Sequence, residues 1–95
     1  MLIVIVKFPP VKAGKDAEFQ EWFVWSNEEF AKIKGFIRRR LLKSVNDGEY
    51  MVLMELESSE VLSALQGSSA HSEAGMRVKP LLEGLPTPEL YESIF

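Results

Sequence analysis

The sequence contains no cysteine and only one histidine, and this removes several kinds of site. Without cysteine the chain can form no disulfide, no thiolate metal site and no cysteine nucleophile. The single histidine, His71, has no second ligand at helical spacing, so we expect no metal. A small fold without disulfides fits a reducing compartment, and we expect a soluble cytoplasmic domain.

The sequence also lacks a basic excess and a long apolar segment. Its 11 Lys and Arg against 14 Asp and Glu give a net charge of -3, which offers no footprint for nucleic acid. The apolar run over residues 1–6 is ended by Lys7-Phe8-Pro9-Pro10. It is too short for a membrane span and has no signal-peptide cleavage site. We therefore expect a single domain over residues 1–95, with neither a nucleic-acid nor a membrane partner.

Two predicted strands are apolar on both faces. Residues 1–6 read Met-Leu-Ile-Val-Ile-Val, and residues 50–54 read Tyr-Met-Val-Leu-Met. Because alternate side chains of a strand point to opposite sides, a sheet with one solvated face would alternate apolar and polar residues. A chain of 95 residues cannot supply helices for both faces. We therefore expect a second copy of the chain to cover one face, as a homodimer formed through the sheet.

The segment after the first strand has helical periodicity. Its apolar positions form one stripe with Ser26 in a gap, and they are Phe19, Trp22, Phe23, Phe30 and Ile33. The stripe predicts a helix that begins at Lys15 or Asp16 and ends at Lys34. Gly35 follows as a C-terminal stop.

The rest of the chain predicts three more strands and a second helical region. Residues 36–43 and the run from Tyr50 read as antiparallel strands, joined by a hairpin turn at Asn46-Asp47-Gly48. A short helix follows Ser58, a further helix contains Pro80, and the tail from residue 88 reads as a last strand. The order β-α-β-β-α-β predicts an α+β, ferredoxin-like fold with a four-stranded antiparallel sheet.

Several stretches, taken in order, resemble one known family. Residues 11–19 are similar to its lead-in to the first helix, residues 34–42 to its second strand, and residues 55–60 to its strand-to-helix junction. Residues 68–71, Ser-Ser-Ala-His, resemble its turn before the last helix, and residues 90–92 its final strand. The family is the antibiotic biosynthesis monooxygenases (ABM). The resemblance implies a ferredoxin-like domain that pairs into a dimeric α+β barrel and binds a small aromatic or polyketide-like ligand.

The chain departs from that family at the positions that carry chemistry. A tryptophan in the helix after the third strand corresponds to Ala64 here. The haem-ligating histidine of the haem-degrading members corresponds to Ala74 or Gly75, and their asparagine falls near Phe8. The resemblance therefore implies the scaffold without a haem site, and we expect no cofactor.

Two side chains outside the apolar stripe are candidates for a ligand pocket. His71 has a reference pKa close to neutrality and is the natural acid–base candidate. The alternative is an exposed or locally hydrogen-bonded histidine in the first turn of a helix. Trp25 lies about 120° around the helix from the centre of the stripe. It would line a pocket mouth or a subunit contact, or be partly buried without a specific role.

The third candidate is Arg39, in the run Arg38-Arg39-Arg40. Strand alternation places Arg39 with Ile37 on one face, which we expect to be the face toward the helices. It places Arg38 and Arg40 with Phe36 on the opposite face, where glutamates of the neighbouring strand would pair with them. The Arg39 guanidinium needs a partner, either a carboxylate of the first helix or a bound anionic ligand.

Two functions remain open at this point. The first is a cofactor-independent monooxygenase, with a small ligand held between helices and sheet and with His71 and Arg39 as its polar groups. The second is a non-catalytic homodimer that binds a small ligand or serves as an assembly module. A missing or filled pocket would favour the second.

Overall fold

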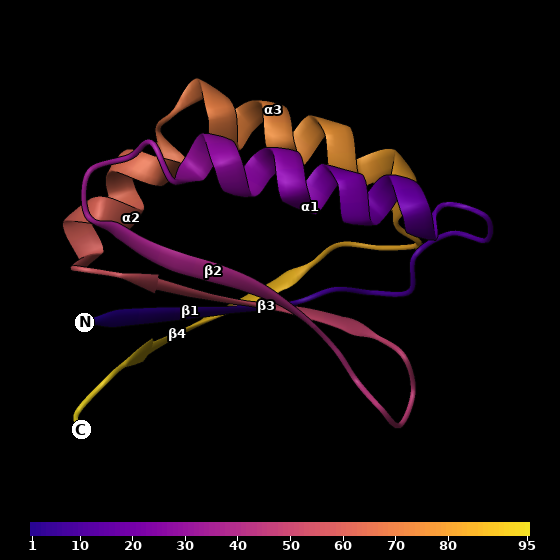
Figure 1. Ribbon diagram of the computed structural model, residues 1–95, viewed down its shortest axis with the longest axis horizontal. Helices are drawn as coiled ribbons and strands as arrows, with labels where there is room; N and C mark the ends of the chain where they lie inside the picture. The colour runs from indigo at the N-terminus through magenta and orange to yellow at the C-terminus, as the bar shows by residue number, and fades with distance from the viewer.

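The computed structural model describes residues 1–95 as one antiparallel sheet with every helix on the same face (Figure 1). The elements in chain order are β1 (Leu2–Lys7), α1 (Asp16–Phe30), β2 (Phe36–Lys43), β3 (Tyr50–Leu56), α2 (Ser59–Gln66), α3 (Ser69–Val78), a 3₁₀ turn (Lys79–Leu81) and β4 (Thr87–Glu92). The four strands lie in the order β2-β3-β1-β4, with each neighbouring pair antiparallel. The predicted ferredoxin-like fold is confirmed.

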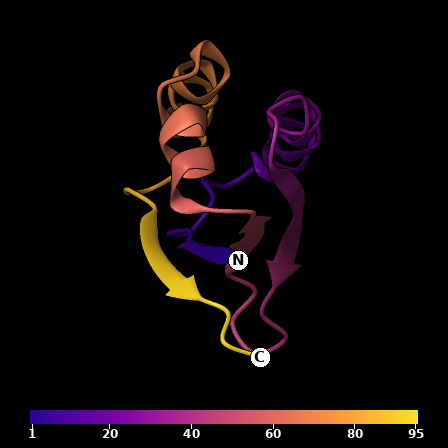
Figure 2. The ribbon, with the colours of Figure 1, turned by 90° about the vertical axis from the view of Figure 1, so that its left-hand side faces the viewer.

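The sheet has one covered face and one bare face, as the end-on view shows (Figure 2). On the covered face the helices bury Val4 of β1 and the alternate β3 residues Val52, Met54 and Leu56. On the bare face, Ile3, Ile5, Met51 and Leu53 are half-buried and no element of the chain lies over them. None of the helices has the length and apolar character needed to cross a membrane.

The first helix ends at Phe30, so the prediction that it continues to Lys34 is wrong. The N–H of Ile33 bonds the carbonyl of Phe30 at 3.1 Å, which tightens the chain into turns after the helix. Gly35 then adopts φ +93°, and a Cβ there would lie 2.4 Å from Cγ2 of Val61. Gly35 is therefore needed for the turn beneath α2 into β2, where a side chain has neither the conformation nor the space.

A β-bulge in β2 changes which side chains share a face. The register shifts between Phe36 and Arg38, so Phe36 lies opposite Leu56 and packs against the core. Ile37 is 46% exposed. The prediction that Phe36 shares a face with Arg38, and Ile37 with Arg39, is therefore wrong, because an extra residue in one strand reverses the alternation before it. Arg39, beyond the bulge, lies on the covered face as predicted, opposite Met54.

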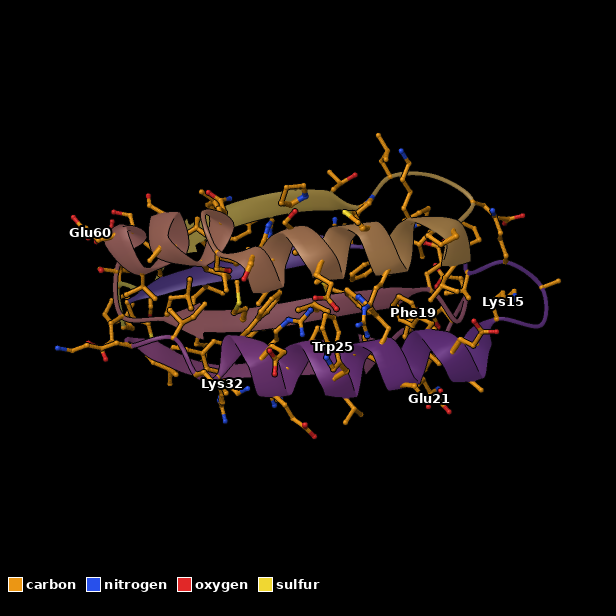
Figure 3. All side chains as sticks on the ribbon, turned by 90° about the horizontal axis from the view of Figure 1, so that it is seen from above. Lys15, Phe19, Glu21, Trp25, Lys32 and Glu60 are labelled. Atoms are coloured by element: carbon orange, nitrogen blue, oxygen red, sulfur yellow. The ribbon has the colours of Figure 1, made fainter.

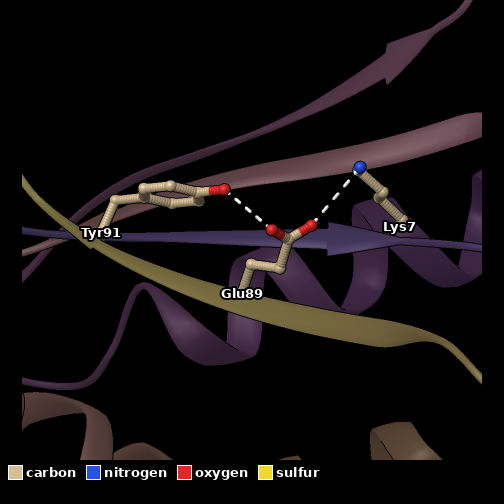
Figure 4. A network of polar contacts seen from close by, with 3 residues as sticks. All are labelled: Lys7, Glu89 and Tyr91. Atoms are coloured by element: carbon tan, nitrogen blue, oxygen red, sulfur yellow. Dashed lines mark hydrogen bonds and ion pairs between the residues drawn. The ribbon is translucent and has the colours of Figure 1, made fainter.

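Polar groups border the apolar centre of the bare face on both sides. On the β2 side Arg38 pairs with Glu55, as predicted, whereas Arg40 forms no ion pair. On the β4 side the Tyr91 hydroxyl donates to Glu89 at 2.8 Å, and Lys7 Nζ lies 3.4 Å from the same carboxylate (Figure 4). The Tyr91 hydrogen bond and the Lys7 charge hold the pKa of Glu89 below its usual value. The bare face thus has an apolar strip between two charged margins.

Candidate functional site

A cavity of about 350 Å³ lies between the helices and the covered face of the sheet. Of the 17 residues that line it, 11 are hydrophobic, and Phe8, Trp22 and Phe30 are aromatic. Its opening lies between the helices α2 and α3 and the start of β4, where the exposed lining residues are Gln66, His71, Gly75 and Pro88. This central cavity has the size and apolar lining of a small-molecule site.

Arg39 is the only Lys, Arg, Asp or Glu residue in the lining of the central cavity, and its side chain is buried, with 8% of the residue exposed. Its Nη1 donates to the Ser26 hydroxyl at 2.8 Å. Its Cζ lies 4.6 Å from the ring centre of Phe23 and 4.8 Å from that of Phe30. No carboxylate lies within ion-pair distance, so the expected partnership with a glutamate of the first helix is wrong. A hydroxyl and aromatic rings surround the cation instead.

The local structure of α1 explains how Arg39 is held. Trp22, Phe23, Ser26 and Phe30 recur at helical spacing on one side of the helix and all contact the guanidinium. Ser26 is fully buried and donates its own hydroxyl hydrogen to the carbonyl of Phe23 at 3.0 Å, which leaves its oxygen free to accept from Arg39. Burial lowers the pKa of Arg39 to about 10, so the side chain still carries its charge at neutral pH.

His71 lies in the first turn of α3 and is exposed, as one of the two predicted alternatives has it, and it also lines the opening of the same cavity. Its backbone N–H donates to the Ser68 hydroxyl at 3.2 Å, which caps the helix. Its ring stacks on Phe30, with 6.1 Å between ring centres and 24° between planes. Partial burial, and then the positive charge of Arg39, lower the pKa of His71 from 6.5. The imidazole is therefore neutral at neutral pH and able to accept a proton.

Trp25 lies apart from these two residues. It is half-buried on the side of α1 that faces α3, where Figure 3 labels it, and Cζ of Arg77 in α3 lies 4.1 Å from its ring centre. Trp25 lines a shallow hollow between the two helices and not the central cavity. The tryptophan of the central cavity is Trp22, whose Nε1 donates to the Ala74 carbonyl at 2.9 Å. The structure thus brings Arg39 and His71 together and leaves Trp25 outside.

Sequence reasoning did not assign Ser26, Phe30 or Trp22 to the site, because Trp22 and Phe30 belonged to the predicted core stripe and Ser26 was taken as a gap in it. Ser26 carried the one available signal, since it is a polar residue in the gap of an apolar stripe. No group of three or more His, Asp or Glu side chains lies close enough together to hold a metal ion. Ala74 and Gly75 line the cavity, whereas Ala64 is exposed on α2.

Comparison with known proteins points to one family. The family model described as antibiotic biosynthesis monooxygenase matches residues 1–76. A search of curated proteins finds no match. A solved structure from Nitrosomonas europaea has a TM-score of 0.88 at 18% identity, with 100% of each chain covered. A second solved structure, from Caulobacter crescentus CB15, has a TM-score of 0.87 at 26% identity, and the match covers 99% of this chain and 91% of that chain. The structure of SnoaB, a cofactor-independent oxygenase from Streptomyces nogalater, has a TM-score of 0.85 at 18% identity. The match covers 97% of this chain and 91% of SnoaB.

Proposed function

Because the chain belongs to the antibiotic biosynthesis monooxygenase family, we propose that it oxygenates a small aromatic or polyketide-like substrate without a cofactor. The observation that carries this proposal is the central cavity, in which a neutral His71 and a cationic Arg39 face a ligand space with apolar walls. Such a site suits a flat, apolar molecule that must lose a proton before it reacts. The similarity to SnoaB supports the scaffold for this chemistry.

The reaction we propose draws its electrons from the substrate. His71 accepts a proton from an activated methylene group next to an aromatic ring, and the carbanion gives electrons to molecular oxygen. A carbon–oxygen bond forms, and the resulting hydroperoxide loses water. The methylene becomes a carbonyl: one oxygen atom stays in the substrate, and the other leaves as water together with both methylene hydrogens. The chain supplies position, burial, the proton acceptor and a positive charge beside the anion.

The proposed active form is a homodimer joined through the bare face. The central cavity lies on the opposite face of the sheet, so pairing of two bare faces leaves both cavities free. Ile3, Ile5, Met51 and Leu53 would gain the apolar cover that the chain itself does not give them.

The test is oxygen consumption with anthrone, whose central methylene would be converted into the second carbonyl of anthraquinone. The assay contains a chelator and no flavin or haem. The expected result is a rate well above that of buffer, which falls by a factor on the order of 10² in His71→Gln. Trp25→Phe is the control, because Trp25 lies outside the central cavity, and it keeps the wild-type rate. A wild-type rate equal to that of buffer, or an unaffected His71→Gln, would contradict the proposal.

A non-catalytic ligand-binding dimer is the second candidate. This candidate is favoured by two positions at which the chain departs from the family's pattern. The chain has Ala64 where the resemblance implies a tryptophan, and apolar residues near Phe8 where it implies an asparagine. This candidate predicts that aromatic ligands raise the melting temperature, because they bind only the folded state, while oxygen consumption stays at the buffer rate.

A further inference from the structure

We propose that the central cavity selects substrates with an ionised ring oxygen, a phenolate or enolate, and that Arg39 is the residue that binds this oxygen. The inference rests on the function proposed above and adds the substrate class to it. It assigns Arg39 a role in specificity, distinct from proton transfer by His71.

The charge inventory of the cavity is the first argument. The chain carries 14 acidic residues and a net charge of -3, yet none of the 17 lining residues is Asp or Glu. The lining holds a single arginine, and that arginine forms no ion pair. A buried cation without a counter-ion is costly, and an anion brought by the ligand would offset that cost.

The way Arg39 is held is the second argument. Trp22, Phe23 and Phe30, all from α1, lie around the guanidinium with ring centres 5.5, 4.6 and 4.8 Å from Cζ. Its only hydrogen bond to another side chain is the one from Nη1 to Ser26. A guanidinium has several further N–H donors in a fixed plane, which suit a charged oxygen. Because Arg39 lines the cavity, these are the donors that a bound molecule meets.

The neighbouring rings supply the third argument. Phe30 contacts both Arg39 and the His71 ring, and Phe8 lies edge-on to Trp22 with 5.9 Å between ring centres. Four of the side chains that line the cavity end in planar rings, so the cavity presents ring faces and edges to a planar ligand. These rings belong to Phe8, Trp22, Phe30 and His71. A planar ligand with a charged oxygen therefore matches both the shape and the charge of the site.

A pair of nearly isosteric probes tests the inference. 2-Hydroxy-1,4-naphthoquinone is an anion at neutral pH, whereas 2-methoxy-1,4-naphthoquinone cannot ionise. Quenching of tryptophan fluorescence reports binding, because Trp22 lines the cavity. We expect the anion to bind about tenfold more tightly or better, since hydrogen bonds to charged groups exceed neutral ones. The preference should disappear in Arg39→Gln and persist in Arg40→Gln, a matched control on the opposite face of the same strand.

Each outcome separates the two proposals. Equal affinity for the two quinones in the wild type overturns the inference without any variant, and so does a preference that survives in a folded Arg39→Gln. If neither quinone binds, both the inference and the proposed ligand site fail. If the anion is preferred but anthrone is not oxidised, the inference stands and only the proposed oxygenation fails.

Discussion

The two faces of the sheet are built from the same two apolar strands but end in different states. On the covered face β1 and β3 are buried under the helices, and the helices leave a central cavity there. On the bare face Ile3 and Leu53 stay half-buried between charged margins. The chain therefore has more apolar strand surface than its own helices can cover. One face borders the central cavity, and the other is left without cover by the chain itself.

Adjacent arginines of β2 show the same contrast at the level of single residues. Arg38, on the bare face, pairs with Glu55, as a solvent-facing strand pair usually does. Arg39, on the covered face, is enclosed by aromatic rings and a hydroxyl and has no acidic partner. The residue type is the same, and the face of the sheet determines which groups surround the guanidinium.

The largest effect is expected from a charge placed on the covered face. Val4 is 4% exposed, so Val4→Asp buries a carboxylate without a partner and lowers the free energy of unfolding by roughly 3 kcal/mol or more. Circular dichroism during thermal and urea unfolding measures the loss. Val4→Ala is the control for lost volume and should cost clearly less. A wild-type-like melting curve for Val4→Asp would contradict the assignment of this face to the core.

A charge on the bare face is expected to break assembly and leave the fold intact. Leu53→Asp places a carboxylate at the centre of the apolar strip, where two copies would meet. Sedimentation should show a monomer with native circular dichroism. Val45→Asp adds the same charge at a turn residue that is 98% exposed and should leave assembly unchanged. A Leu53→Asp variant that assembles like the wild type would show that the partner does not sit there.

The pH dependence of oxygenation sharpens the assignment of His71. Its pKa is lowered by partial burial and by the charge of Arg39, so the neutral, proton-accepting form persists below pH 6.5. The rate should be constant around neutral pH and fall only as the pH drops through this lowered pKa. In Arg39→Gln the fall should move toward higher pH, since the charge that opposes protonation is gone. A rate profile centred above pH 6.5 in the wild type would be inconsistent with this role.

The smallest effect is expected from haemin. Helix α3 has Ala74 and Gly75 at the positions where the resemblance implies the axial histidine of haem-degrading family members, and His71 lies about one helical turn earlier. Titration should therefore give no sharp Soret shift and no change in melting temperature. The contrary finding would be a tight one-to-one complex whose spectrum is lost in His71→Ala.

Sequence patterns predicted the features that depend on periodicity. The two-sided strands, the order of elements and the covered position of Arg39 all follow from alternation along a strand or spacing along a helix. Patterns failed where one residue changes the register locally. The bulge before Arg38 reverses the faces of Phe36 and Ile37, and the close approach of Val61 to Gly35 follows from how α2 packs.

The central cavity itself could not be predicted from the sequence. It is the space left between side chains of all three helices and of the strands β1, β2 and β3, and its size depends on how these side chains pack in three dimensions and not on their spacing along the chain. The partner of Arg39 was missed for a related reason. Ser26 was read as a gap in the core stripe, whereas its buried hydroxyl accepts the hydrogen bond from the guanidinium. A polar residue within an apolar helical stripe therefore indicates a candidate hydrogen-bond partner for a buried charged side chain.

Sedimentation of the wild-type chain at low micromolar concentration is the most direct test of the difference between the two faces. Two copies joined through the bare face predict a species of about twice the 10.8 kDa chain mass, with a melting temperature that rises with protein concentration. A monomer with a cooperative melt independent of concentration would contradict the account, because the apolar strip of the bare face would then be stable in water without a partner.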